Sequence, residues 1–419
     1  MSTVTITGAG VVCCLGHEAA AVTDAVRHQR HGLRPWLAAP GTRPRPAGTL
    51  PGFDLEETTP RAWSWPEGTP IEPSLVRMLP PHGVPVLVAA REAFAEAGLS
   101  AAGLRDGRTG LAVASAGSPR LLFHHLKAFE GKGWRNCHPL GVPTSAPGGL
   151  AFTLAAAWGI QGPVTGFCTG CVSAAVALCH AADAVAGGTV DRMIVAAGED
   201  LTAETFLPFD GLGALSPQSD PEFASRPFDA ARDGFVPAGG AAVFVVENSS
   251  SAAGRGVEPV AVLRGWAQSG DGWHAVQPHP DGDGIARAMR LAMERAGCRT
   301  NDIGHVNAHA ASTQAGDRAE ATAIRRVFGA GHGPPVSSLK ALLGHSLNAA
   351  AGVELAVVLR CLAAGFIPAQ SHLRDVDPAC GGLHLPREPL AYDGRLLLKN
   401  GVGFGGANVA LVLSLPQRP

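Results

Sequence analysis

The chain has 419 residues, of which 46% are hydrophobic, so it can bury the core of one large or two medium domains. Its 33 basic and 35 acidic residues leave a formal net charge of -2, which excludes a whole-chain attraction to nucleic acid or to an anionic membrane. The first residues lack a signal-peptide pattern, and no stretch approaches the roughly 18–20 consecutive apolar residues of a membrane span. We therefore expect a soluble cytoplasmic protein that binds no nucleic acid.

Short β-prone runs alternate with longer alanine-rich helical runs in the first half of the chain. Such alternation is typical of α/β layering with largely buried strands. Residues 35–85 interrupt it with a proline- and glycine-rich stretch that carries Trp36, Trp63 and Trp65, which we interpret as an excursion over the surface. Strands are predicted at residues 4–7, 110–114, 192–197 and 241–247, and a helix at 19–27.

A serine-, alanine- and glycine-rich run at residues 249–256 is a predicted linker near the middle of the chain. The pattern on either side predicts two unequal α/β halves, residues 1–249 and 257–419, although no letter-by-letter repeat relates them. In the second half we expect a strand from residue 260, helices at 285–296, 318–328 and 349–362, a turn at 305–309, and strands at 396–398 and 409–413.

Cys171 lies where an apolar run turns through Gly170 into an alanine-rich helix. The free amides and dipole of a helix start stabilise a thiolate, so this placement predicts a nucleophile with a lowered pKa. With Cys168 it also forms a C-x-x-C, which leaves a redox pair or half a zinc site open. No second pair at suitable spacing completes a metal site, so no metal is expected.

Three further segments stand out, and each alone has an ordinary structural explanation. His309 is expected at a loop or strand end, and it could be a hydrogen-bonded structural histidine. Lys340 and His345 lie five residues apart near a helix start, where a lysine is usually solvated. Phe404 lies in a GFGG turn where only glycine reaches positive φ. Asp317 and Glu320 could be first-turn partners of a helix dipole.

Together and in this order, the four segments resemble the β-ketoacyl synthase family, the condensing enzymes of fatty-acid and polyketide synthesis. The segment SRPFDAARDGFVPAGGAAVFVVE resembles the family's SRPFDxxRDGFVxGEGAG, and GFGGAN its GFGGTN. Cys171 falls in an element similar to GPxxxxxTACxSG. His309 and His345 fall on the histidines of AHGTSTxxGDxxE and KxxxGHxxGAAG. The resemblance runs nearly end to end.

The resemblance implies an α/β thiolase-like fold, with two pseudo-repeated βαβαβαββ halves in a five-layered αβαβα core. It also implies that Cys171 accepts an acyl group and that His309 and His345, as neutral donors, stabilise the enolate left when a malonyl thioester loses carbon dioxide. The amides of Cys171 and Phe404 would form the oxyanion hole. Lys340 would hold a histidine or a carboxylate such as Glu354. No cofactor is expected to be bound, because phosphopantetheine arrives on the acyl carrier protein.

The chain departs from the family pattern at three positions that matter. Ala311 and Val276 replace threonines associated with the pantetheine arm, although Thr313 remains, and Asn348 replaces a glycine. Each lost hydroxyl removes a hydrogen bond of roughly 1 kcal/mol. The TGC at Cys171 resembles aromatic polyketide systems more than fatty-acid enzymes.

Two other functions stay open: an acyltransferase that does not elongate, and a partner subunit like a chain-length factor, which typically lacks the nucleophile. The resemblance implies a homodimer, with a heterodimer as its rival. Basic residues that could meet an acidic carrier protein, or form only an ordinary solvated face, are Arg318, Arg325 and Arg326, or Lys127, Lys132 and Arg135.

Overall fold

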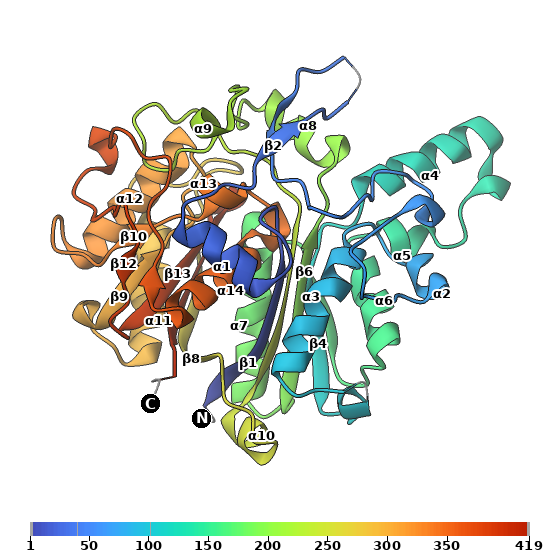
Figure 1. The fold of residues 1–419 in the computed structure, drawn as a ribbon, viewed down its shortest axis with the longest axis horizontal. Helices are drawn as coiled ribbons and strands as arrows, with labels where there is room; N and C mark the ends of the chain where they lie inside the picture. Colours follow the sequence, from blue (N-terminus) through green and yellow to red (C-terminus); the bar gives the residue numbers. More distant parts are fainter. Residues whose placement is uncertain (1–2, 40, 101, 417–419) are drawn as a thin grey trace.

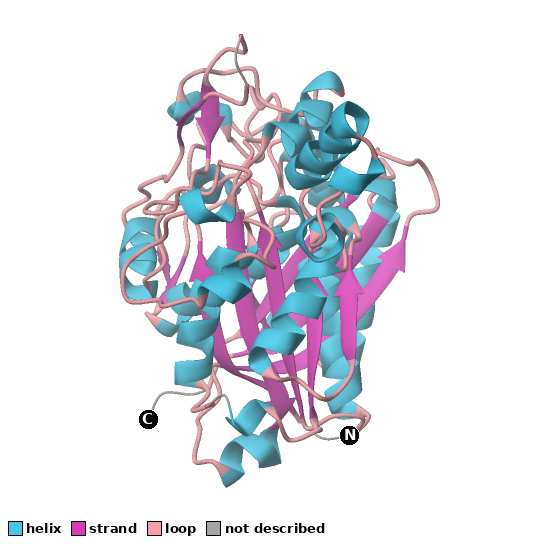
Figure 2. Ribbon diagram, turned by 90° about the vertical axis from the view of Figure 1, so that its right-hand side faces the viewer, coloured by secondary structure: helices cyan, strands magenta, loops and turns pink. Residues whose placement is uncertain are grey.

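The computed structural model describes residues 3–39, 41–100 and 102–416. Its centre is a ten-stranded sheet in the order β10-β9-β13-β14-β8-β1-β7-β6-β4-β5, with helices on both sides of the strands (Figures 1 and 2). Nearly all residues of β1, β6 and β7 are buried, which explains why the sequence shows continuous apolar runs there instead of alternation.

The sheet consists of two five-stranded halves with the same order. Taken along the chain, the strands of each half lie in the order 1-5-4-2-3, and in each half the first two pairings are antiparallel and the last two parallel. The halves meet where β1 pairs with β8 over three residues. The first half holds β1 (Val4–Val12), β4 (Thr109–Ala114), β5 (Val164–Phe167), β6 (Arg192–Glu199) and β7 (Gly240–Asn248). The second holds β8 (Ala261–Gly270), β9 (Ile303–Asn307), β10 (Val336–Ser337), β13 (Leu396–Gly403) and β14 (Ala407–Ser414).

Six helices complete the five layers. Two central helices, α7 (Ser173–Ala186) and α14 (Ala350–Ala363), share one apolar core with strands of both halves. The outer face of the first half is covered by α3 (Gly83–Glu96) and α6 (Gly149–Trp158), and that of the second by α11 (Asp283–Ala296) and α12 (Gln314–Phe328). Each half therefore reads βαβαβαββ, and the predicted thiolase-like α/β architecture is confirmed.

Several local predictions need correction. Residues 249–254 are not an open linker but a short helix, α10 (Ser249–Gly254), because the Asn248 side chain caps it by accepting from the Ser251 amide at 2.7 Å. His305 lies inside β9, not in a turn, and its imidazole Nε2 is 3.0 Å from the Ser337 hydroxyl. The irregular stretch after residue 35 ends where α3 begins at Gly83, and its Trp63 and Leu79 are buried against α3.

The remaining elements are short or lie at the periphery. The strands are β2 (Arg34–Trp36), β3 (Arg45–Ala47), β11 (Phe366–Ile367) and β12 (Leu390–Ala391). The helices are α1 (Ala19–Arg27), α2 (Pro73–Val76), α4 (Pro119–Lys132), α5 (Gly141–Ser145), α8 (Ala203–Gly211), α9 (Pro221–Ala224) and α13 (Lys340–Leu343). Among the described residues, no helix has both the length and the apolar character that a membrane crossing requires.

Candidate active site

Cys171 lies in a 3-10 helix, Gly170–Val172, that connects β5 to the central helix α7. Gly170 has a φ of 64°, a conformation that favours glycine, so the turn ahead of the thiol depends on this residue. The hydroxyl of Ser173 accepts from the Thr169 amide at 2.8 Å and so closes the turn. The predicted helix start is therefore present, with the Cys171 side chain only 7% exposed.

The two predicted histidines meet at this thiol. The Nε2 of His345 is 3.2 Å from the Sγ of Cys171, and the rings of His309 and His345 lie 5.3 Å apart at an angle of 80°. His309 follows the end of β9, and His345 follows α13 after Gly344, whose φ is 70°. Residues separated by up to 174 positions are thus held as one cluster.

Burial dominates the electrostatics of this cluster and overturns one expectation. Desolvation raises the pKa of Cys171 to about 12, because burial outweighs the opposing charge of Lys340. The lowered thiol pKa predicted from the helix start is therefore wrong for the protein without substrate. Burial, followed by the charge of Lys340, lowers the pKa values of His309 and His345 well below the ordinary range. Both imidazoles are neutral at pH 7.

Lys340 and Glu354 are buried partners behind the histidines. The Nζ of Lys340 donates to the His309 carbonyl at 2.6 Å and forms an ion pair with Glu354. Glu354 also pairs with Lys399 of β13 at 2.5 Å. Lys340 and Lys399 are each 1% exposed and Glu354 2%, so the solvated-lysine reading is wrong.

Glu320 and Asp317 of α12 hold the backbone that carries His309. The Glu320 carboxylate accepts from the amides of His309 at 2.8 Å and Ala310 at 2.6 Å. Asp317 accepts from the Phe228 amide at 2.9 Å. Both carboxylates are buried and hold neighbouring backbone. Asp317 lies in the first turn of α12, as predicted, and accepts from the Thr313 amide at 3.2 Å, whereas Glu320 lies beyond the first turn.

Asn348 connects the Cys171 turn to a buried carboxylate. Its Nδ2 donates to Glu199 at 2.9 Å, its Oδ1 lies 2.7 Å from the Ser173 hydroxyl, and its backbone amide donates to Glu199 at 3.2 Å. Burial, then repulsion from Asp200, raises the pKa of Glu199 to about 8. The replacement of glycine by Asn348 therefore adds a polar bridge beneath the nucleophile.

A cavity of about 340 Å³ opens over the thiol. Phe404 is 39% exposed at this cavity, and its ring centroid is 5.6 Å from that of Phe209. Gly405 and Gly406 have φ values of 77° and 72°, so the GFGG turn requires its glycines. The cavity wall contains Thr313, the threonine that remains for the pantetheine arm. It also contains Ala311 and Val276, which replace the family's other two threonines.

Sequence reasoning missed Lys399 and Glu199, and it missed the roles of Glu320 and Asn348. Lys399 could have been found from a lysine inside an otherwise apolar run, and Glu320 from its place in the motif of His309. No sequence signal pairs Glu199 with Asn348, because they lie 149 positions apart. Cys168 and Cys171 carry free thiols, and among the described residues neither belongs to a cluster that could hold a metal.

The arrangement can perform covalent acyl chemistry. A thiol beside a neutral imidazole can pass its proton to the Nε2 of His345 as it attacks a carbonyl carbon. Two neutral imidazoles within one cavity can also donate to an oxygen that gains negative charge.

Comparisons with known proteins agree with this geometry. The sequence model of the family beta-ketoacyl synthase, N-terminal domain, matches residues 1–252. The sequence model of the C-terminal domain matches residues 260–374. A protein named as a polyketide beta-ketoacyl synthase 1 in Streptomyces halstedii is 37% identical over 79% of this chain and 81% of its own length. The 3-oxoacyl-[acyl-carrier-protein] synthase 1 of Escherichia coli is 32% identical over 99% of both chains.

Solved structures give the same result. The crystal structure of a beta-ketoacyl synthase from Burkholderia phymatum matches all of this chain and all of its own with a TM-score of 0.90 and 30% identity. The ishigamide ketosynthase/chain length factor matches 99% of this chain and 100% of its own with a TM-score of 0.87 and 27% identity. The chain belongs to the β-ketoacyl synthase family and is an acyltransferase that forms carbon–carbon bonds by decarboxylative condensation.

Proposed function

We propose that the chain elongates acyl groups on an acyl carrier protein in a polyketide-type pathway. The observation that carries the proposal is the contact of 3.2 Å between Cys171 Sγ and His345 Nε2, with His309 beside it. A chain-length-factor-like partner needs no such nucleophile, so this contact favours the catalytic subunit. The polyketide assignment draws on the TGC sequence at Cys171 and on the relative from Streptomyces halstedii.

The first half-reaction transfers the acyl group to the thiol. Cys171 Sγ attacks the carbonyl carbon of the acyl thioester, while its proton passes through His345 Nε2 to the departing pantetheine sulfur. The C–S bond to pantetheine breaks as the C–S bond to Cys171 forms. The amides of Cys171 and Phe404 are the proposed donors to the oxyanion, and Phe404 at the cavity mouth is the proposed gate for the acyl chain.

The second half-reaction forms the carbon–carbon bond. The malonyl thioester loses carbon dioxide, and the electron pair of the broken bond forms an enolate whose oxygen accepts from the neutral imidazoles of His309 and His345. The enolate carbon then attacks the acyl carbonyl, and the Cys171 thiolate leaves and regains a proton. Because both histidines are neutral, each has one N–H to give, and donation requires the tautomer whose N–H faces the enolate oxygen.

Pantetheine contacts are the point at which this chain differs from its family. Thr313 lies on the cavity wall and can bond the arm, whereas Ala311 and Val276 on the same wall cannot. Two missing hydrogen bonds weaken arm binding by about 2 kcal/mol, or about 30-fold, if nothing compensates. The variant Ala311→Thr should therefore lower KM for carrier-bound substrate more than it changes kcat.

The decisive experiment separates elongation from acyl transfer alone. The chain is incubated with acyl-loaded and malonyl-loaded carrier protein, and the released carbon dioxide and the product mass are measured. Elongation releases carbon dioxide and adds two carbons, whereas the mass of acylated Cys171 without that release would contradict the proposal. Cys171→Ala should abolish product, and a fully active assembly with Cys171→Ala would assign the chain a partner role.

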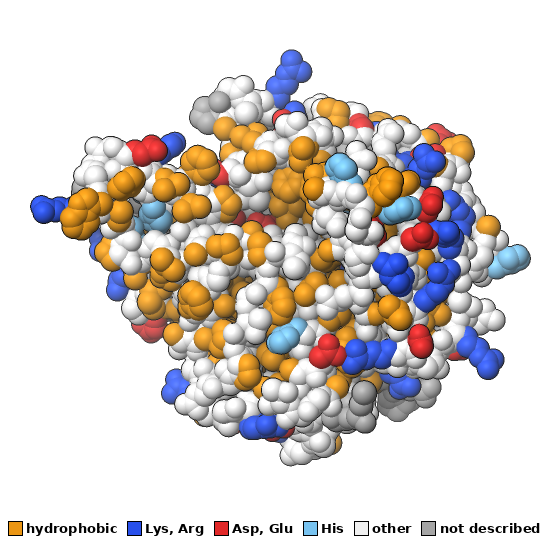
Figure 3. All heavy atoms as spheres, turned by 180° about the vertical axis from the view of Figure 1, so that it is seen from behind, with side chains coloured by type: hydrophobic (Ala, Val, Ile, Leu, Met, Phe, Trp, Pro, Cys, Tyr) orange, Lys and Arg blue, Asp and Glu red, His pale blue; other side chains and the backbone are white. Residues whose placement is uncertain are grey.

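The oligomer proposed is a homodimer built on the free edge of β5. This strand ends the sheet, and Val164 on it is 40% exposed. Apolar side chains of α4 and α6 extend the same surface, on the side of the molecule that shows hydrophobic atoms in Figure 3, and they include Phe123, Phe129 and Phe152. Light scattering should give a mass of twice the 42.8 kDa of one chain. Phe123→Glu should lower the measured mass, whereas Leu212→Glu, a change at another exposed residue, should leave it unchanged.

Arg318 is the best placed of the basic residues proposed to meet a carrier protein. It is exposed two residues beyond the cavity-lining Gly316, whereas Arg325 donates to the Ala379 carbonyl and Arg326 pairs with Asp283. Arg318→Glu should raise KM for an acidic carrier protein, whereas a rise in KM for Lys127→Glu alone would assign the contact to the other basic residues proposed.

A further inference from the structure

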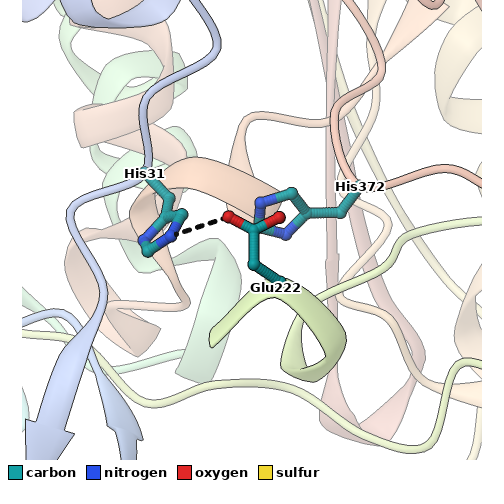
Figure 4. A group of neighbouring side chains, drawn as sticks. All are labelled: His31, Glu222 and His372. Carbon is teal, nitrogen blue, oxygen red and sulfur yellow. Dashed lines mark ion pairs between the residues drawn. The ribbon is translucent and has the colours of Figure 1, made fainter. Parts of the chain in front are cut away.

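Three metal-ligating side chains converge far from the cavity. His31 follows α1, Glu222 lies in α9, and His372 lies in the loop after β11. One ligand atom from each lies within 4.8 Å of the other two, and Figure 4 shows the Glu222 carboxylate between the two imidazole rings. Because the three segments are distant in the sequence, the fold itself brings these groups together.

The hydrogen bond of His372 leaves one ring nitrogen free to bind a cation. Its Nδ1 is 3.0 Å from the Ser225 carbonyl, which can only accept, so Nδ1 carries the proton and Nε2 carries the lone pair. A carbonyl that orients a ligating imidazole in this way is typical of metal sites. The backbone of His372 has a φ of 58°, a conformation uncommon for histidine that turns the ring into the cluster.

His31 and Glu222 supply the other two ligands and leave one side of the site open. His31 Nε2 is 3.3 Å from a Glu222 carboxylate oxygen, and the two imidazole rings have centroids 5.5 Å apart at 74°. The His31 side chain is 19% exposed and that of Glu222 58%, so an ion can reach them from solvent. The buried Nδ1 of His31 has no hydrogen-bond partner among the described residues.

The local charges permit a divalent cation. Arg374, whose charge acts on His372, holds its guanidinium 4.0 Å from the centre of the Phe223 ring. Two imidazoles and one carboxylate form a donor set that suits Zn²⁺ and its transition-metal neighbours better than Mg²⁺ or Ca²⁺.

We propose that His31, Glu222 and His372 bind one Zn²⁺-like ion, with water as the fourth ligand. Such an ion joins two loops and the helix α9 at one point. It lies next to Ser225, whose hydroxyl donates at 2.8 Å to the carbonyl of Lys340, the residue that contacts His309. The bound ion would therefore stabilise the backbone around Lys340, behind the catalytic histidines, without contacting substrate.

The test measures metal binding directly. After dialysis against a chelator, calorimetric titration with Zn²⁺ should give one site per chain, and Zn²⁺ should raise the midpoint of thermal unfolding. His372→Asn keeps a residue that tolerates positive φ but removes the ligating nitrogen, so it should lower the affinity at least about 10-fold. Glu222→Gln should do the same, and neither variant should gain the thermal shift.

A matched control comes from the second group able to hold a cation, His279, Asp281 and Asp283. If the loss of Zn²⁺ follows His279→Gln instead of His372→Asn, the proposal is wrong. Co²⁺ serves as a reporter, because thiolate ligation by Cys168 or Cys171 would give a sulfur-to-cobalt charge-transfer band and would also overturn it. Unchanged binding by both variants at the proposed site, His372→Asn and Glu222→Gln, is the third refuting outcome.

Discussion

Replacing Asn348 with glycine, the residue the family pattern has there, tests the bridge beneath Cys171. The substitution removes the bond from Nδ2 to Glu199 at 2.9 Å and the contact of Oδ1 with Ser173 at 2.7 Å. Each buried hydrogen bond contributes about 1 kcal/mol, and glycine in a helical turn costs up to about 1 kcal/mol more. We expect Asn348→Gly to lower the free energy of unfolding by about 2–3 kcal/mol at pH 6.

The loss should grow with pH because Asn348 acts on an ionisable group. The pKa of Glu199 is about 8 in the folded chain against an ordinary 4.5, so its contribution to stability is complete below pH 4.5 and falls as pH rises through 8. The Asn348 hydrogen bonds oppose this rise. Without the side chain the folded pKa of Glu199 is higher still, and stability keeps falling above pH 8. One further pKa unit adds about 1.4 kcal/mol.

Urea unfolding followed by tryptophan fluorescence at pH 6 and pH 9 measures both effects. Ser173→Ala leaves the bond to Glu199 in place but removes both the contact with Asn348 and the bond from the Thr169 amide, so it should cost about 2 kcal/mol, with little change between the two pH values. An equal loss for Asn348→Gly at both pH values would refute the coupling to Glu199. If Asn348→Gly lowers the free energy of unfolding by less than about 1 kcal/mol at pH 6, the Asn348 hydrogen bonds do not stabilise the fold as proposed.

Three more predictions concern the site. His309→Ala should slow condensation about 100-fold, equivalent to about 3 kcal/mol, while mass spectrometry still detects acylated Cys171; loss of acylation as well would contradict the assigned role. Alkylation of Cys171 by iodoacetamide should accelerate about 10-fold per pH unit from pH 7 to 10, and a plateau below pH 9 would disprove the raised pKa. Glu354→Gln should destabilise the fold by about 3–5 kcal/mol in thermal unfolding, because Lys340 and Lys399 then face each other unpaired; a smaller loss than for Lys340→Met would argue against this.

The sequence predicted helix bounds best, because the apolar pattern of a helix lies within a single segment of the chain. Helix α1 has the predicted bounds, and α11, α12 and α14 begin or end within a few residues of prediction, because each helix packs an apolar face on a hydrophobic core. Strands β13 and β14 extend beyond prediction, because glycines at residues 401 and 403 look like turn residues but pair in the ladder. Strand order could not be predicted, since pairing depends on contacts between distant segments.

The sequence predicted those site residues that lie within its motifs. Cys171, His309, His345 and Phe404 were found from motif order, and the structure brings all four to one cavity. Their electrostatics could not be predicted, because burial decides them: the same helix start that favours a thiolate on the surface holds a neutral thiol in the core. The contacts of Asn348 and Lys399 depend on partners more than forty positions away.

The buried lysines explain how a neutral thiol and neutral histidines can still promote anionic chemistry. Lys340 and Lys399 share the single carboxylate of Glu354, so these three side chains together carry one net positive charge behind the cavity. After burial, the charges of Lys340 and Lys399 lower the pKa values of His309 and His345, and the charge of Lys340 opposes the raised pKa of Cys171. The same field therefore disfavours imidazolium in the resting protein and favours negative charge on the attacking sulfur and on the enolate oxygen, where each transition state develops it.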